Sequence, residues 1–294
     1  MDLIRALLAA QPAVVDSLAA WWAATANERA AFATPVERAV IGGALADRVG
    51  YAFAGGYGEA LRALLPGLEG ITALCITEAG GNHPKAIETK LVAVAGGYEV
   101  SGHKKWATVG SLAQSLLVCV TVGEHRLRMV RVRADAPGLT ITASNVPFVP
   151  EIPHAEITLD RVRIAEADVL PGDGYDDYVK PFRTIEDIHV HAALLGYLVG
   201  VARRKQLPRD VSERLLALVE TARSLARADA KAATTHVALA GAFALIAREL
   251  TALEQLWAAA PDDEWQRWQR DRALLQVAGK AREARRDKAW SLLP

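Results

Sequence analysis

The residues best suited to chemistry in this sequence are one carboxylate and two imidazoles within a single apolar stretch. Glu186, His189 and His191 lie between Thr184 and Gly196. The spacing of Glu186 and His189 is that of half a di-metal site in a helical bundle, but such a site needs a second helical copy, and the sequence holds none. His189 and His191 are two residues apart, so they lie on different faces of a helix. The sequence therefore predicts no metal site.

Two interpretations of Glu186 stay open on the residues alone. A carboxylate near the start of a helix commonly stabilises that helix through the dipole. A carboxylate held in apolar surroundings has a raised pKa, closer to neutral pH, and can then act as a general base.

A second candidate pair, Trp106 and Thr108, stands at the end of a β-rich run. An indole offers a flat surface for stacking, and a neighbouring hydroxyl can form a hydrogen bond with whatever is stacked there. The alternative is a core tryptophan at a strand end, followed by a threonine that binds the backbone. The remaining histidines, at positions 125, 154 and 236, are typical of surface or loop positions.

The two cysteines, Cys75 and Cys119, each sit inside an apolar run, which indicates buried small side chains rather than a disulfide framework. This cysteine usage is typical of a reducing compartment, so we expect a cytoplasmic protein. Residues 1–24 alternate as an amphipathic helix interrupted by Pro12 and Asp16, which favours a helix over a signal peptide.

Composition excludes two classes of function. Lys and Arg number 34 and Asp and Glu number 34, so the net charge is zero and no basic nucleic-acid surface is expected. No uncharged apolar run reaches the roughly 18 residues of a membrane span, so no span is expected either. About half of the chain is apolar, as in an ordinary folded protein.

These candidate residues are carried by three consecutive segments, the first helical, the second of strands and the third helical. Residues 1–70 have helical periodicity, with one helix from Val36 to Leu65, a soft break at Gly55-Gly56 and a stop at Pro66-Gly67. Residues 71–170 read as short strands separated by Gly, Pro, Asn and Asp, with Gly96-Gly97 as a hairpin turn. The expected strands are Ala73–Thr77, Lys90–Ala95, Tyr98–His103, Ser115–Val122, Leu127–Arg133, Leu139–Ala143 and His154–Leu159.

Residues 171–294 become helical again. The expected helices are Thr184–Arg204, Val211–Lys231, Thr235–Ala259 and Asp262–Leu292, the last with Asp262 or Asp263 as its N-cap. The sequence thus predicts an α+β multi-domain fold with N-terminal helices, a central antiparallel β-barrel or sandwich, and a C-terminal helical bundle. The expected domains are residues 1–70, 71–170 and 171–294.

The central segment resembles the middle domain of the acyl-CoA dehydrogenase family. The run Thr77-Glu-Ala-Gly-Gly-Asn82 is similar to the family's Thr-Glu-Pro-x-x-Gly-Ser-Asp turn. The run Gly102-His-Lys-Lys-Trp-Ala-Thr108 is similar to its Gly-x-Lys-x-Trp-Ile-Thr strand end. The later runs Ile157–Ile164 and Val169–Gly174 follow in the family's order, and the resemblance extends from about residue 36 to 204.

The resemblance implies a bound FAD. In the family, the Trp and Thr of the second motif pack on the flavin ring and bind near its N5, and Trp106 and Thr108 match those positions. Ile76 and Thr77 match the positions that touch the pyrimidine edge of the ring. His83 stands in the turn that meets the diphosphate, where its ring could donate a hydrogen bond.

The sequence also departs from the family. Asn82-His83-Pro84 replaces the Gly-Ser-Asp of the phosphate turn, and Pro84 has no N–H to offer a phosphate. The Arg-x-x-Phe-Gly segment, the C-terminal glycine turn and the catalytic Glu usual before that turn are not found. The first domain, about 70 residues, is also shorter than is usual in the family.

Glu186 matches an alternative position for the family's catalytic base, used by the isovaleryl-CoA and long-chain types, ten residues before Gly196. The next residue in those proteins is often an Arg that helps to hold the CoA nucleotide. It is Asp187 here, and a carboxylate there would repel phosphate, unless Arg183 or Lys180 takes over.

The resemblance implies a FAD-dependent oxidation of a Cα–Cβ bond in an acyl thioester carried by CoA or a carrier protein. One alternative is a degenerate, non-catalytic paralogue that binds a thioester or serves as the partner subunit of a complete dehydrogenase. A weaker alternative is a flavin monooxygenase of the same fold. The expected assembly is a homo-oligomer, or a heteromer with a dehydrogenase paralogue.

Overall fold

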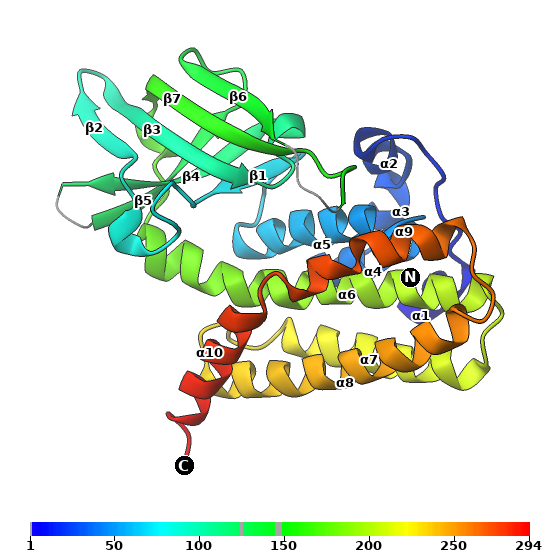
Figure 1. Cartoon of the computed structure of the whole chain (residues 1–294). Helices are drawn as coiled ribbons and strands as arrows, with labels where there is room; N and C mark the ends of the chain where they lie inside the picture. Colours follow the sequence, from blue (N-terminus) through cyan, green and yellow to red (C-terminus); the bar gives the residue numbers. More distant parts are fainter. Residues whose placement is uncertain (1, 124–125, 145–148) are drawn as a thin grey trace. The chain divides into compact units, whose positions relative to one another are not determined.

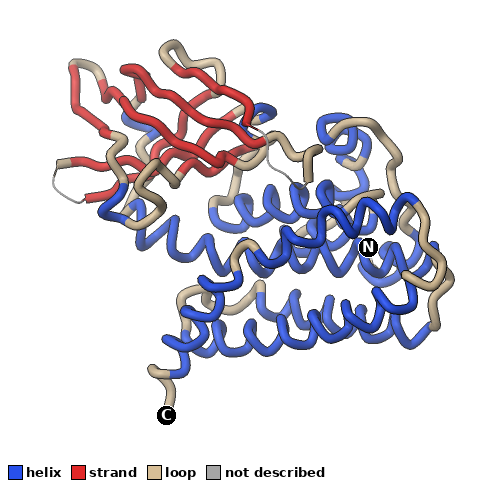
Figure 2. The backbone as a smooth tube through the Cα atoms, viewed as in Figure 1, coloured by secondary structure: helices blue, strands red, loops and turns tan. Residues whose placement is uncertain are grey.

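The structure is a computed structural model that describes residues 2–123, 126–144 and 149–294. The chain forms two compact units, one of residues 1–63 and 184–294 and the other of residues 64–183 (Figure 1). The first unit holds the helices from both ends of the chain, and the second holds the β-strands, as the colouring of Figure 2 shows. The first and last of the three segments expected from sequence thus share one unit.

The N-terminal helices are more broken than the periodicity predicts. They are α1 (Leu3–Ala9), α2 (Leu18–Ala24), α3 (Ala26–Ala30), α4 (Pro35–Ala44) and α5 (Val49–Leu64). The single helix expected from Val36 to Leu65 is interrupted between Ala44 and Val49, not at Gly55-Gly56. Both glycines lie inside α5. Their small size serves packing, because a Cβ on Gly56 would lie only 2.8 Å from the His189 carbonyl oxygen.

The C-terminal helices are α6 (Lys180–Arg204), α7 (Arg209–Leu225), α8 (Ala233–Trp257), α9 (Asp263–Asp271) and α10 (Gly279–Trp290). Asp262 caps α9 as expected, since its side chain accepts a hydrogen bond from Trp265 N. The prediction of one helix from Asp262 to Leu292 is wrong in one respect, because a 3-10 turn, Arg272–Gln276, separates α9 from α10. This break sets α10 against α8.

Helix α6 runs through the middle of the helical unit (Figure 1). It is buried almost throughout from Asp187 to Ala202. Glycines let the neighbouring backbones come close: a Cβ on Gly196 would lie 2.0 Å from the Val40 carbonyl oxygen, and one on Gly43 would lie 1.8 Å from that of Ala193. Helices α4 and α6 therefore pack closely at two glycines, Gly43 and Gly196.

All seven expected strands are present. They are β1 (Thr72–Cys75), β2 (Lys90–Val94), β3 (Gly97–Ala107), β4 (Ser115–Val122), β5 (Arg126–Arg133), β6 (Leu139–Ser144) and β7 (His154–Ile164). The hairpin at Gly96-Gly97 joins β2 to β3, with φ +80° and +146° at the two glycines. The fold class is confirmed.

The two cysteines are buried and unpaired, and burial raises the pKa of Cys75 to about 12 and of Cys119 to about 11.

The strands form one mixed sheet in the order β1-β4-β2-β3-β7-β6, with β5 on the other edge of β4. Most pairings are antiparallel, as expected, but β1 and β2 both run parallel to β4. The long connections from β1 and β2 to β4 make this possible, since parallel pairing needs a crossover that a tight turn cannot supply. This arrangement brings the end of β1 beside β3, where the candidate residues lie.

Two helical stretches, Gly174–Arg204 and Ala233–Trp257, are long and apolar enough to cross a membrane, judged by length and composition alone. The first is 89% buried over its most apolar window, as is usual for the core helix of a folded domain, and the second is 22% buried.

Candidate functional site

Trp106 sits at a bulge near the end of β3. The pairing of β3 with β7 shifts register between Lys104 and Ala107, and the backbone of Trp106 adopts φ +61°. A bulky residue in this left-handed region is strained and needs support from its surroundings. The side chain is 53% exposed, so the core interpretation of Trp106 is wrong: the bulge turns the indole outward and offers an apolar face to a ligand.

The residues before Trp106 fasten it to the end of β1. Lys105 N donates to the Thr77 carbonyl oxygen at 2.9 Å, and Lys104 Nζ donates to the Ile76 carbonyl oxygen at 3.2 Å. Ile76 and Thr77 are both half-buried. Three of the residues predicted from sequence, Ile76, Thr77 and Trp106, are therefore brought together in space.

A buried ion pair holds this junction. Lys104 Nζ lies 2.6 Å from Glu78 Oε1, and both side chains are almost completely buried. The same carboxylate accepts from Thr89 N and Oγ1 and from Glu88 N. Burial acts to raise the pKa of Glu78, but the hydrogen bond and charge of Lys104, with the Glu88 and Thr89 donors, outweigh burial and hold the pKa below its usual value. Glu78 is thus a fixed anion that positions the loop.

Sequence reasoning missed this pair, although a signal was present. Side chains alternate between the two faces of a strand, and Lys104 is four residues after the buried Val100 on β3. Its side chain is therefore on the same, inner face as that of Val100. A lysine there requires an anion. Glu78, at the end of a buried strand, is the nearest available carboxylate in the first motif.

Thr108 follows directly on β3. Its side chain is half-buried between the buried residues Ala107 and Val109, and Val109 has φ +55°. The left-handed backbone at both Trp106 and Val109 fixes the intervening segment, so Thr108 shares the strand end with the indole.

In the turn expected to meet a diphosphate, backbone groups are bonded to each other. Glu78 and Gly81 exchange two backbone hydrogen bonds of 3.0 Å, which occupy the Gly81 N–H. His83 is exposed, and its Nδ1 accepts from Lys85 N, which caps the short turn Pro84–Ala86. Since Nδ1 is an acceptor, a neutral His83 carries its proton on Nε2. The turn therefore offers a phosphate the His83 ring, in place of a row of N–H groups.

Glu186 belongs to the helical unit and is half-buried on α6. Its neighbour Asp187 is buried, with Arg282 Nε at 2.8 Å from one carboxylate oxygen and Arg285 bound to the other. Asp187 is thus neutralised by α10 and does not project a bare negative charge.

The two histidines of α6 bind its backbone: His189 Nδ1 lies 2.8 Å from the Ile185 carbonyl oxygen, and His191 Nδ1 lies 2.7 Å from that of Asp187. In the part of the chain that the structure describes, no three His, Cys, Asp or Glu side chains are grouped to hold a metal ion. His154 is half-buried and burial lowers its pKa, and His236 lies in the first turn of α8, so neither is a free surface residue. His125 lies outside the described residues.

Comparison with known proteins gives one curated relative at the sequence level. It is benzylmalonyl-CoA dehydrogenase of Aromatoleum aromaticum, 30% identical over 150 residues, which are 48% of this chain and 38% of the relative. The chain therefore matches well under half the length of this relative. No family model matches the chain.

Solved structures resemble the chain over most of its length. Butyryl-CoA dehydrogenase of Megasphaera elsdenii superposes with a TM-score of 0.66 at 15% identity, covering 87% of this chain and 81% of that one. The apo form of PigA gives 0.67 at 13% identity, over 95% and 90% of the two chains. The prolyl acyl carrier protein oxidase AnaB gives 0.65 at 16% identity, over 88% and 82%. These superpositions establish a shared fold, and at identities this low they establish the fold alone.

Proposed function

We propose, from the premise that this chain has the acyl-CoA dehydrogenase fold and resembles that family in sequence, that it is a FAD-dependent oxidoreductase acting on a Cα–Cβ bond of an acyl thioester. The observation that carries the proposal is the outward-facing Trp106, held in a strained conformation beside Thr77 by the buried Lys104–Glu78 pair. The names of the relatives support the substrate class: one is named for an acyl-CoA, and one for an acyl carrier protein. PigA, which shares the fold, is seen with FAD.

The residues at the end of β3 fit the ring of a flavin. An exposed indole supplies a stacking surface, and the Thr108 hydroxyl and the Ile76–Thr77 backbone supply polar groups at its border. When bound, the flavin supplies a hydride acceptor. The phosphate turn fits less well, since the Gly81 N–H is occupied and Pro84 has none, so His83 would be the residue that meets the diphosphate.

Glu186 is the residue proposed to remove the substrate's α-proton. Loss of that proton to the carboxylate, together with departure of the β-hydrogen as hydride, leaves a carbon–carbon double bond and balances charge and electrons. Glu186 is half-buried and precedes the continuously buried part of α6, and a carboxylate in such a place is suited to accept a proton from a bound substrate.

The neutralisation of Asp187 supports a phosphate-bearing carrier. The sequence suggested that this carboxylate would repel the phosphates of CoA. Arg282 and Arg285 occupy both of its oxygens, which removes that objection. We propose the thioester of CoA or of a carrier protein as substrate, a cytoplasmic location and an oligomeric assembly.

An absorption spectrum of the purified protein tests the proposal. We expect flavin bands near about 370 and 450 nm, retained through gel filtration, and bleaching of the band near about 450 nm on anaerobic addition of a substrate thioester. A protein that stays colourless after incubation with FAD and desalting contradicts it. Glu186→Gln should keep the bands and lose the bleaching.

The second candidate is a non-catalytic paralogue, and the occupied phosphate turn is the observation that favours it. Copurification with a longer dehydrogenase subunit, without flavin in this chain, would support this alternative. A flavin monooxygenase of the same fold needs no α-proton base, so full turnover by Glu186→Gln would support that third function.

A further inference from the structure

A cavity of about 320 Å³ lies inside the helical unit, apart from the residues assigned above. It opens between α6, α8, α10 and the 3-10 turn that precedes α10, and this volume is at the lower end of the range for small-molecule sites. All of its lining residues belong to one compact unit. The helix break that sequence reasoning missed is what creates it, because the 3-10 turn and α10 supply one wall.

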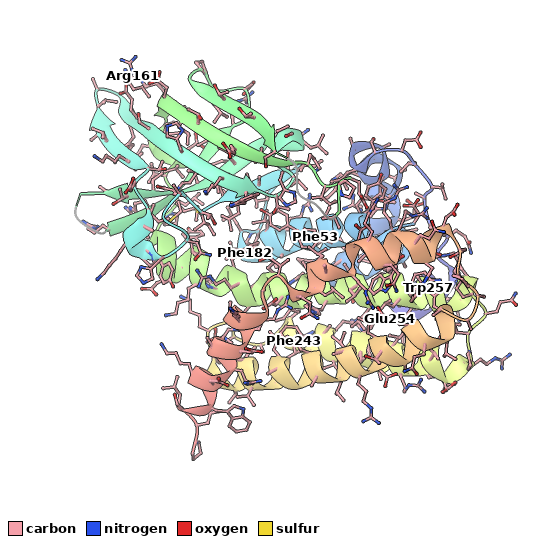
Figure 3. All side chains as sticks on the ribbon, in the orientation of Figure 1. Phe53, Arg161, Phe182, Phe243, Glu254 and Trp257 are labelled. Carbon is pink, nitrogen blue, oxygen red and sulfur yellow. The ribbon has the colours of Figure 1, made fainter. Side chains whose placement is uncertain are left out.

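The inner wall of the cavity is apolar. Leu194 of α6, Leu275 of the 3-10 turn, and Phe243, Ala247 and Leu250 of α8 line it. Figure 3 labels Phe243, whose ring packs against that of His191 at 4.5 Å between centroids and lies under the Arg282 guanidinium at 5.0 Å. His191 adds no charge to this wall, since burial lowers its pKa to about 4.

One face of α10 gives the cavity a positive side. Arg282, Arg285 and Arg286 all line it, as the spacings of three and four residues on a helix allow. Arg282 and Arg285 share the buried carboxylate of Asp187, so two guanidinium groups of low exposure face one compensating charge there. Arg286 pairs with the exposed Asp287, and Glu283 is an exposed anion at the rim.

We propose that this cavity binds a small monocarboxylate with an aliphatic or aryl body. The body would pack against Phe243, Leu194 and Leu250, and the carboxylate would lie at Arg285 and Arg286. Among the lining residues three guanidinium groups accompany one carboxylate, Glu283, because the partners Asp187 and Asp287 lie outside the lining. These guanidinium donors favour an anion, and an uncharged or cationic compound of the same shape would lose that contribution. None of its lining residues is among those proposed to hold the flavin or to act as the base.

Calorimetric titration of the full-length protein with hexanoate, hexan-1-ol and hexylammonium tests the charge requirement. We expect saturable binding of one hexanoate per chain, with hexan-1-ol at least about tenfold weaker and hexylammonium weaker still. Hexan-1-ol binding as tightly as hexanoate, or no saturable hexanoate binding up to 20 mM (roughly the weak limit for a ligand of eight non-hydrogen atoms), overturns the proposal.

Variants locate the site. Ala247→Phe places a ring in the cavity and should abolish binding, whereas Ala238→Phe lies on the opposite side of α8, outside the lining, and should leave it unchanged. Arg286→Gln should weaken hexanoate about two- to fivefold and Glu283→Gln should strengthen it by a similar factor. Equal effects of the two Phe variants overturn the assignment. Repeating the titration with and without added FAD separates this result from the flavin proposal.

Discussion

At the scale of single residues, the candidate site depends on one strained tryptophan and one buried ion pair. Trp106 keeps a left-handed backbone because the register shift in β3 and the bond from Lys105 to Thr77 fix the chain on both sides. Strain that is maintained in this way is typical of sites where a side chain must point in a particular direction.

Replacing Trp106 with glycine separates folding from binding. Trp106→Gly should leave the stability unchanged or raise it by about 1 kcal/mol, because glycine adopts φ +61° without strain. FAD affinity should fall roughly tenfold or more as the stacking surface is lost. Trp290→Ala, which removes a similarly exposed indole from α10, is the control and should retain flavin. Equal flavin retention in both variants would remove Trp106 from the proposed site.

Removing one partner of the ion pair should lower the free energy of unfolding more than removing both partners. Glu78→Gln leaves the buried Lys104 charge unpaired, and we expect a loss of about 3–5 kcal/mol in the free energy of unfolding measured in urea. The double variant Glu78→Gln with Lys104→Met should recover much of that loss. A double variant less stable than the single one would show that the pair is not the cause.

At the scale of elements, the helical unit is assembled by glycines that allow backbones to touch. Two helix-interior glycines give a matched comparison, since alanine alone favours a helix by about 1 kcal/mol. A Cβ added to Gly196 on α6 would meet the Val40 carbonyl oxygen. A Cβ added to Gly241 on α8 would meet no described atom within 4 Å, apart from its chain neighbours and the backbone of its own helix.

The two substitutions should therefore have opposite effects. Gly196→Ala should destabilise the protein by more than about 2 kcal/mol, because the clash is with backbone that must shift. Gly241→Ala should stabilise it by about 0.5–1 kcal/mol. Thermal unfolding of the two variants beside the parent chain measures both effects, and the same sign of change in both would refute the packing argument.

At the scale of the whole molecule, buried histidines contribute to the response of folding to acid. Burial lowers the pKa values of His154 in the β unit and of His189 and His191 in the helical unit, and the pKa of His191 falls to about 4. A histidine in the unfolded chain binds a proton at about pH 6.5, above the folded value. The unfolded state therefore gains protons first as pH falls, and stability is lost between about pH 6.5 and 4.

His191 should account for about 3 kcal/mol of that loss. We expect His191→Gln to flatten the dependence of the free energy of unfolding on pH across this window, in urea titrations at several pH values. His236→Gln, on the neighbouring helix α8, is the control. The free energy of unfolding of this variant should depend on pH more steeply than that of His191→Gln. A His191→Gln slope equal to that of the parent chain would contradict the assignment.

The sequence alone determined the order of helices and strands, all seven strands, the hairpin at Gly96-Gly97 and the placement of Trp106 in a family motif. Local periodicity and turn residues carry that information, since they depend on neighbours along the chain. It failed where distant backbones meet: Gly55-Gly56 resembles a helix break because the contacts of these glycines with α6 and Trp21 are not visible in sequence.

Only the tertiary structure decided the charges and the exposure of the site. The outward indole of Trp106 depends on a bulge against β7, and the fixed carboxylate of Glu78 depends on Lys104, which is 26 residues away. Asp187, which the sequence presented as a repulsive charge, is neutralised by arginines nearly a hundred residues later. The electrostatic character of a side chain is set by its neighbours in space, and these neighbours are brought together only when the chain folds.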